Sequence, residues 1–194
     1  MILTKKTFWI PYLTILFLFP LVRSFLQNTS KQVPVIKTLS KDLELVNSTG
    51  ENTSLLKFSK YIILNLHFTR CPGDCIDLMK KTQTLQVKMM PFQHLVHILS
   101  LTIDPYDSLE ILQNFAKEQG ANKNLWSFVK ATEEKFLENY LTEELYLSMS
   151  LGKDIFELAH SVKFVLIDPQ HRIRGYYNEL DPLLLDFGFL MYTP

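Results

Sequence analysis

The sequence predicts an α/β domain, in which apolar strands alternate with amphipathic helices. Two runs of strand-forming residues, 61–68 and 94–103, are almost continuously apolar, as in strands covered on both faces. A helical pattern follows each run, and a third strong strand at 161–167 leads into an expected hairpin. Apolar residues make up 47% of the chain and charged residues 21%, which excludes an intrinsically disordered protein.

Charge and cysteine content exclude several classes of protein. Twenty basic and twenty acidic residues give zero net charge, so we expect no nucleic-acid partner. Two cysteines are too few for a disulfide scaffold or a structural zinc finger. Residues 1–26 contain three basic residues and no acid, which leaves a net charge of −3 on the remainder. The N-terminus is therefore a different kind of segment.

The N-terminal segment, 1–26, is predicted to be a signal anchor that spans a membrane. Lys5 and Lys6 precede the apolar run FWIPYLTILFLFPLV, the order typical of such an anchor. Residues 20–30 contain no Ala or Gly for a cleavage site, which favours an uncleaved anchor over a cleaved signal. Pro11 and Pro20 disfavour the third option, a buried core helix. The globular part would then lie outside the cytoplasm.

The next segment, 27–40, is polar and contains Pro34, which predicts a linker before a globular domain at 41–194. Two short stretches, 41–47 and 55–58, flank the sequence NSTGEN. This pattern predicts an N-terminal β-hairpin with its turn near Gly50.

The remaining elements follow from apolar runs, caps and breakers. Pro91 ends a helix, Asp107 or Ser108 can cap the next one, and Gly120 closes it. The expected elements are strands at 61–68, 94–103, 125–129, 161–167 and 172–177, and helices at 75–89, 109–119, 132–149 and 180–190.

A cysteine motif, TRCPGDC, lies between the first buried strand and its helix, as in a thioredoxin-like domain. A helix N-terminus stabilises thiolates, and residues four apart lie on one helix face about 6 Å from each other. Cys71 and Cys75 could therefore form a disulfide or share a metal ion. Three intervening residues favour the metal, and a structural disulfide or two inert thiols stay open as alternatives.

Copper fits this pair better than zinc. Two thiolates select Cu(I), whereas zinc needs four donors and the chain has no further cysteine. An imidazole would complete the copper site, and His160 directly precedes the strand at 161–167, whose entry loop packs beside the cysteine turn in a thioredoxin-like fold. His160 as a plain loop or core residue is the alternative. The other histidines suit the site less well. His67 is expected to be a packed strand residue, and His171 is expected to be solvated in the last turn. His94 and His97 flank a strand and point to opposite faces, which makes them a poor chelate.

Three stretches in the same order resemble the Sco/SenC copper-chaperone family. TRCPGDC is similar to its C-P-x-x-C-P element, and SLTIDPYDSLEILQNFAKEQG to its S-x-D-P-x-x-D stretch and following helix. AHSVKFVLIDPQHRIRGYY is similar to its D-H-S stretch, strand and hairpin, so the likeness runs from Asp42 to Tyr177. The chain departs from the family pattern with Ile76 after the second cysteine, Ala159 before His160 and His171 in the last turn.

The resemblance implies a thioredoxin-like domain tethered to a membrane. Together with the patterns above, we expect a thioredoxin-like fold with an N-terminal β-hairpin, after an N-terminal transmembrane segment. It implies that Cys71, Cys75 and His160 bind Cu(I), with Cu(II) as a second ion to test. The implied role is delivery of copper to the dinuclear copper site of cytochrome c oxidase, or reduction of that site's cysteines. The partner would be the oxidase's copper-receiving subunit or another copper protein. The domain would face the periplasm or, as a second option, the mitochondrial intermembrane space.

Other functions use the same residues differently. A thiol–disulfide oxidoreductase would use Cys71 as nucleophile and Cys75 as resolving thiol, without needing His160. A peroxidase would need Arg70 beside the reactive cysteine, and a degenerate fold would serve only protein contacts. We expect a metallochaperone rather than an enzyme.

Overall fold

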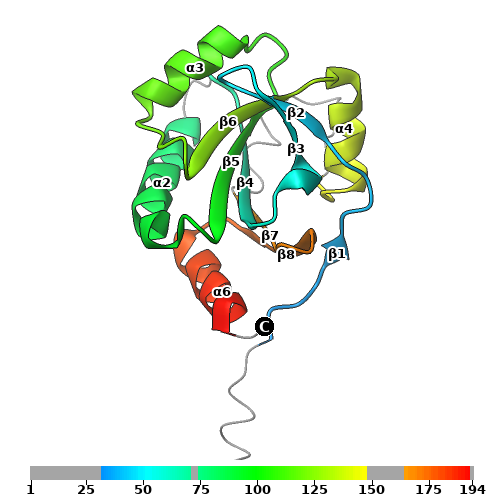
Figure 1. The fold of residues 1–194 in the computed structure, drawn as a ribbon, viewed down its shortest axis with the longest axis vertical. Helices are drawn as coiled ribbons and strands as arrows, with labels where there is room; N and C mark the ends of the chain where they lie inside the picture. The colour runs from blue at the N-terminus through cyan, green and yellow to red at the C-terminus, as the bar shows by residue number, and fades with distance from the viewer. Residues whose placement is uncertain (1–31, 71–73, 148–163, 193–194) are drawn as a thin grey trace, which may run out of the picture. The chain divides into compact units, whose positions relative to one another are not determined.

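The fold is known from a computed structural model that describes residues 32–70, 74–147 and 164–192, with only the backbone of residues 74 and 75. The described strands form one sheet in the order β1-β8-β7-β4-β5-β6-β2-β3 (Figure 1). The predicted alternation of strands and helices is confirmed. The described residues contain no helix that is both long and apolar enough to span a membrane, and the anchor predicted at 1–26 lies outside them.

The centre of the sheet is parallel. Strand β4 (Tyr61–His67) pairs with β5 (Val96–Thr102), and β5 pairs with β6 (Trp126–Ala131). Every residue of β5 is buried, and so is every residue of β4 except Tyr61. This burial explains why both sequences are apolar on both faces.

The two sides of the sheet are antiparallel. Strand β7 (Phe164–Ile167) runs against β4, and β8 (Arg172–Tyr177) runs against β7 after a turn at His171 with φ 59°. On the other side, β2 (Glu44–Asn47) pairs with β6 and with β3 (Asn52–Ser54). The predicted N-terminal hairpin is confirmed, and Gly50 takes the positive φ of 89° that its turn requires.

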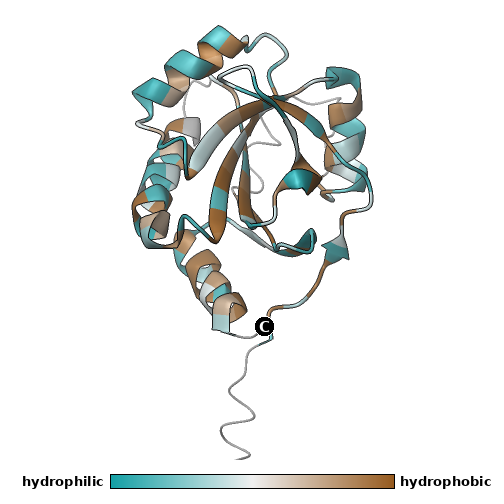
Figure 2. Ribbon diagram, in the orientation of Figure 1, coloured by the Kyte–Doolittle hydropathy of each residue, from teal (hydrophilic) through white to brown (hydrophobic). Residues whose placement is uncertain are grey.

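Helices cover both faces of the sheet. Helices α2 (Asp74–Met89), α3 (Leu109–Glu118) and α6 (Leu180–Tyr192) lie on one face, where α2 and α6 bury Leu85 and Phe187 beside β4 and β5. Helix α4 (Glu134–Glu143) packs Leu141 into the core of the opposite face. Apolar residues accordingly dominate the central strands in Figure 2.

Three boundaries differ from the sequence prediction. The second strand of the hairpin is β3, whereas residues Leu55–Lys57 form a short 3-10 helix, η1. The stretch predicted as linker contains β1 (Lys37–Thr38), which pairs with β8.

The third difference is the helix predicted at 132–149, because α4 ends at Glu143. Glu144 is buried, and its carboxylate accepts hydrogen bonds from the Ser40 N–H at 2.8 Å and the Ser40 hydroxyl at 2.9 Å. Tyr146 then takes a positive φ of 51°, which a helix does not allow. Contacts with a distant segment thus override the local helical pattern.

Candidate metal site

The predicted ligands lie only partly within the described structure. Cys71 and His160 fall outside the described residues, and Cys75 is described only as the second residue of α2. The ligand set therefore stays a prediction. Among the described residues, no group of three or more His, Cys, Asp or Glu side chains is placed to hold a metal ion. The structure does describe β4 and the residues after it up to Arg70, α2 from Asp74 and the strands beside them.

The loop that leads from β4 to the cysteine motif is fixed by the carboxylate of Asp107. Asp107 is fully buried and accepts hydrogen bonds from the Thr69 N–H at 3.1 Å and the Thr102 hydroxyl at 2.6 Å. The Thr69 hydroxyl also donates to it. Three donors from two segments stabilise the charged carboxylate and hold Thr69, two residues before Cys71, against the end of β5.

Arg70 points toward the loop after β5. Its Nη2 lies 2.8 Å from the Asp104 carboxylate, and its guanidinium stacks over the Tyr106 ring at 5.1 Å. The hydrogen bond to Asp104 raises the pKa of Arg70. Because the guanidinium is already bound to Asp104, the arrangement gives no support to the peroxidase alternative, which needs this charge at the cysteine.

Strand β7 brings the chain that follows His160 toward the same end of β4. The strands are antiparallel, with Leu64 opposite Val165 and Ile62 opposite Ile167. The start of β7 therefore lies in the half of β4 that leads to Cys71. His160 precedes the first residue of β7, Phe164, by only four positions.

His67 is the one described histidine near the cysteine end of β4, and it is enclosed by aromatic rings. Its ring stacks on Phe115 at 5.9 Å and meets the edge of Phe128 at 5.0 Å. It is 1% exposed, and neither ring nitrogen has a hydrogen-bond partner. Burial lowers the pKa of His67 to about 4. The prediction that His67 is a packed strand residue is confirmed.

The other described histidines lie toward the opposite end of β4. His97 pairs in register with Ile62, and its Nε2 lies 3.0 Å from the Ser127 hydroxyl. His94 is exposed just before β5 begins. His171 occupies the turn between β7 and β8, and it is half-buried rather than solvated as predicted. None of these three is placed at the end of β4 from which the cysteine motif follows.

A cavity of about 280 Å³ opens between α2 and α3, beside the start of α2. Phe68 and Met79 are buried in its wall, and Ile76, directly after Cys75, is exposed at its edge. The remaining lining residues are Thr69, Lys80, Gln83, Phe115 and Gln119. Thr69 and Ile76, which precede and follow the cysteine pair in sequence, thus line a partly apolar hollow.

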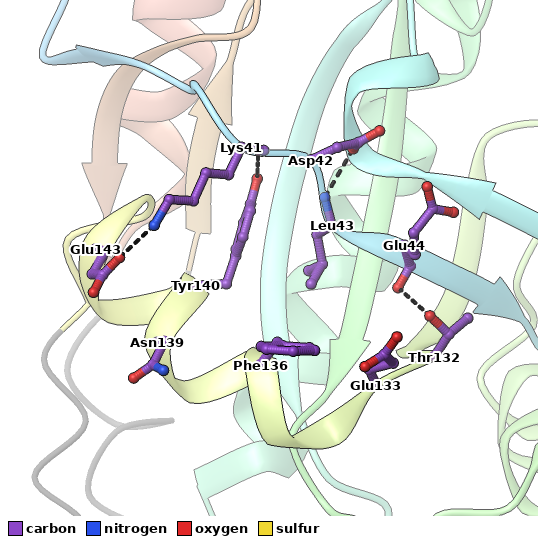
Figure 3. Close-up of a pocket in the computed structure, with 10 residues that line it drawn as sticks. All are labelled: Lys41, Asp42, Leu43, Glu44, Thr132, Glu133, Phe136, Asn139, Tyr140 and Glu143. Carbon is purple, nitrogen blue, oxygen red and sulfur yellow. Dashed lines mark hydrogen bonds and ion pairs between the residues drawn. The ribbon is translucent and has the colours of Figure 1, made fainter.

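A second cavity, of about 450 Å³, lies between β2 and α4, away from the cysteine motif (Figure 3). Lys41 and Glu143 pair across its edge at 2.7 Å, and the Tyr140 hydroxyl donates to the Lys41 carbonyl. The Asp42 carboxylate accepts from the backbone N–H of Leu43. These polar groups bind one another, and the cavity shows no convergence of groups that would carry out chemistry.

The sequence pattern indicates only a helix cap at Asp107. It does not reveal the Asp107 clamp, in which Thr69 and Thr102 donate hydrogen bonds to the buried Asp107 carboxylate. The cap is Ser108, whose hydroxyl accepts from the Ile111 N–H at 3.2 Å. The signal that could have found the clamp is a second aspartate three residues after Asp104, in the short loop that follows a buried strand.

Comparisons with known proteins agree with this arrangement. A structure of BsSco, a member of the Sco family of cytochrome c oxidase assembly proteins, is 19% identical (TM-score 0.68) over 84% of this chain and 99% of that chain. A protein of Aquifex aeolicus VF5 is 25% identical (TM-score 0.65) over 80% and 94%. Copper-bound yeast Sco1 is 17% identical (TM-score 0.59) over 80% and 92%.

The likenesses to BsSco and yeast Sco1 show the fold and confirm that it is the thioredoxin-like fold of these proteins. A search of curated protein sequences gives no match. The SCO1/SenC family model matches residues 33–183, most of the chain and nearly all of the described sheet. The chain belongs to the SCO1/SenC family.

Proposed function

We propose that this chain binds copper through Cys71, Cys75 and His160 and delivers it to another protein. Two thiolates and one imidazole form a donor set that suits Cu(I), because thiolate is a soft ligand. The N-terminus of α2, where Cys75 is the second residue, favours the thiolate form. Copper is then the cargo of the protein.

The observation that carries the proposal is the direction of the strands around the cysteine motif. The start of β7 lies in the half of β4 that leads to Cys71, which favours His160 as the imidazole donor. His94, His97 and His171 lie toward the other end, and His67 is enclosed by aromatic rings.

The relatives suggest the recipient. BsSco belongs to a family of cytochrome c oxidase assembly proteins, and yeast Sco1 and Bradyrhizobium japonicum ScoI have been solved with copper bound. We extend this role to the present chain, with the dinuclear copper site of cytochrome c oxidase as the target. Residues 1–26 would tether the domain to a membrane, with the domain in the periplasm or the mitochondrial intermembrane space.

The test is copper stoichiometry of the reduced full-length protein in detergent. The parent should bind a single copper ion, and Cys71→Ser and Cys75→Ser should each lose it, because one thiolate and one imidazole hold copper poorly. His160→Ala should weaken Cu(II) binding more than Cu(I) binding, since imidazole is the harder donor. His94→Ala is the matched control and should bind like the parent. Parental binding by His160→Ala together with loss in His67→Ala would show that the ligand assignment is wrong.

A thiol–disulfide oxidoreductase is the second candidate, since a helix N-terminus activates thiolates for exchange as well as for metal binding. The proposed copper site needs His160 and disulfide exchange does not, so a variant at this position distinguishes the two functions. Disulfide exchange with a model substrate that survives in His160→Ala, in a protein that retains no copper, would favour the oxidoreductase. Complete oxidation of the cysteine pair should abolish copper binding, because a disulfide offers no thiolate.

A further inference from the structure

From Leu183 to Tyr192, helix α6 is apolar on its outer face as well as on the face that packs against the sheet, whereas its first turn exposes Asp181, four residues before Leu185. Leu185 is 55% exposed and Tyr192 is 85% exposed. Between residues 183 and 192 the only charged residue is Asp186, which is buried and accepts a hydrogen bond from the Tyr177 hydroxyl at 2.9 Å. A shallow hollow on the outer face is lined by Leu184, Leu185, Gly188, Phe189 and Tyr192.

Helix α3 shows what an ordinary surface helix of this domain looks like. It buries Leu112 and exposes one large apolar side chain, Ile111, which is 41% exposed. Its other exposed side chains are polar, and they are Glu110, Gln113, Asn114, Lys117 and Glu118. In Figure 2, α3 is mostly teal and α6 mostly brown. A helix that is apolar all round normally has a second apolar neighbour.

The described chain begins close to α6. Val33 belongs to the same buried cluster as Leu183, Phe187 and Leu190 of that helix. The predicted anchor ends at residue 26, and seven residues of extended chain span at most about 25 Å. Whatever surrounds the end of the anchor is therefore within reach of α6.

We propose that the outer face of α6 lies on the lipid bilayer in which residues 1–26 are anchored. The inference rests on the membrane tether of the proposed function. Leucine and phenylalanine side chains enter the acyl boundary of a bilayer, and tyrosine favours its interface. Because the anchor ends within reach of Val33, the bilayer around it is also the apolar phase nearest to α6.

This contact would orient the domain. The Tyr61 hydroxyl donates to the Leu190 carbonyl at 3.1 Å, so the C-terminal end of α6 lies at the start of β4. Tyr192, the most exposed apolar residue of α6, lies at this end, whereas Cys71 follows the opposite end of β4. The lipid contact would thus leave the cysteine motif open to a partner.

The test uses the full chain in phosphatidylcholine vesicles whose acyl chains carry bromine near the interface, compared with unbrominated vesicles. Trp9→Phe removes the tryptophan of the anchor, and Leu185→Trp or Tyr192→Trp adds a probe on α6. Trp126 stays buried in the core of every variant, so the emission of Trp9→Phe alone is subtracted from that of each probe. Ile111→Trp on α3 is the matched control. The α6 probes should lose about half of their emission, because bromine quenches indoles held at that depth. The α3 probe should keep its emission.

Three results would overturn the inference. If the chain floats with the vesicles but both α6 probes stay unquenched, α6 does not touch lipid although the anchor holds. If those probes are blue-shifted yet unquenched, protein covers the face, either the N-terminal run or a second copy. If the chain does not float with the vesicles, the tether is wrong and the α6 contact falls with it, while the copper assay still tests the ligands. Circular dichroism of each variant confirms folding.

Discussion

The two ends of β4 are organised by different forces. At the end that leads to Cys71, a buried carboxylate, Asp107, holds the chain through hydrogen bonds from Thr69 and Thr102. At the starting end, Tyr61 packs edge-to-face on Phe187 with ring centroids 5.3 Å apart, and its hydroxyl makes one bond to α6.

The end of β4 that leads to Cys71 is thus a loop held in position, whereas the starting end is part of a packed core. Hydrogen bonds to a buried charge fix a loop in one arrangement, since each donor has a required direction. Apolar packing stabilises without direction and tolerates small changes. A loop that presents ligands needs the first kind of support, and the clamp occurs at the end of β4 that leads to the cysteine motif.

The largest effect is expected from Asp107→Ala. The substitution leaves the Thr69 N–H and two hydroxyl groups without their acceptor, which should lower the free energy of unfolding by about 3–5 kcal/mol. Urea denaturation measures this loss. Copper affinity should fall as well, because Thr69 lies two residues before Cys71.

Arg70→Gln is the matched control for Asp107. It removes the ion pair with Asp104 in the same loop, but the Arg70 side chain is 63% exposed and water replaces its contacts. We expect no measurable change in the free energy of unfolding. If Arg70→Gln destabilised the protein as much as Asp107→Ala, the surface ion pair rather than the buried clamp would hold this loop.

The next effect concerns the dependence of stability on pH. Burial lowers the pKa of His67 from 6.5 to about 4. Below pH 6.5 the unfolded chain binds a proton that the folded chain does not, so stability is lost as the pH falls from 6.5 to 4. His67→Leu should remove about 3 kcal/mol of this loss.

Urea denaturation at pH 7 and pH 4 tests this expectation. Part of the acid sensitivity should persist in His67→Leu, because burial also lowers the pKa of His97 to about 4. His94→Leu, at an exposed position, is the control and should unfold like the parent at pH 7. An equal acid loss in His67→Leu and the parent would mean that His67 does not resist protonation in the folded protein.

Much of the fold could be predicted from the sequence, because local signals there agree with the tertiary structure. The two apolar runs form β4 and β5. Helix α3 begins after Ser108 and ends before Gly120, as expected. The position of Cys75 at the start of α2 also followed from the strand–motif–helix pattern.

The remaining features depend on residues that are distant in sequence. Strand β1 is only two residues long and exists because β8 pairs with it. The end of α4 is set by Ser40, about a hundred residues away, which donates to Glu144. The Asp107 clamp likewise needs β4 and β5 side by side. Within the site, the sequence could indicate the residue types but not the support that holds their loop.

The smallest effect is expected at the starting end of β4. Tyr61→Phe keeps the ring against Phe187 and removes only the hydroxyl that donates to Leu190, so the free energy of unfolding should fall by about 0.5–1 kcal/mol. Urea denaturation should show a lower midpoint with an unchanged slope. Tyr192→Phe, on the exposed face of α6, is the control and should match the parent in detergent. A loss in Tyr61→Phe as large as that in Asp107→Ala would break the comparison, because both ends of β4 would then depend on directed hydrogen bonds.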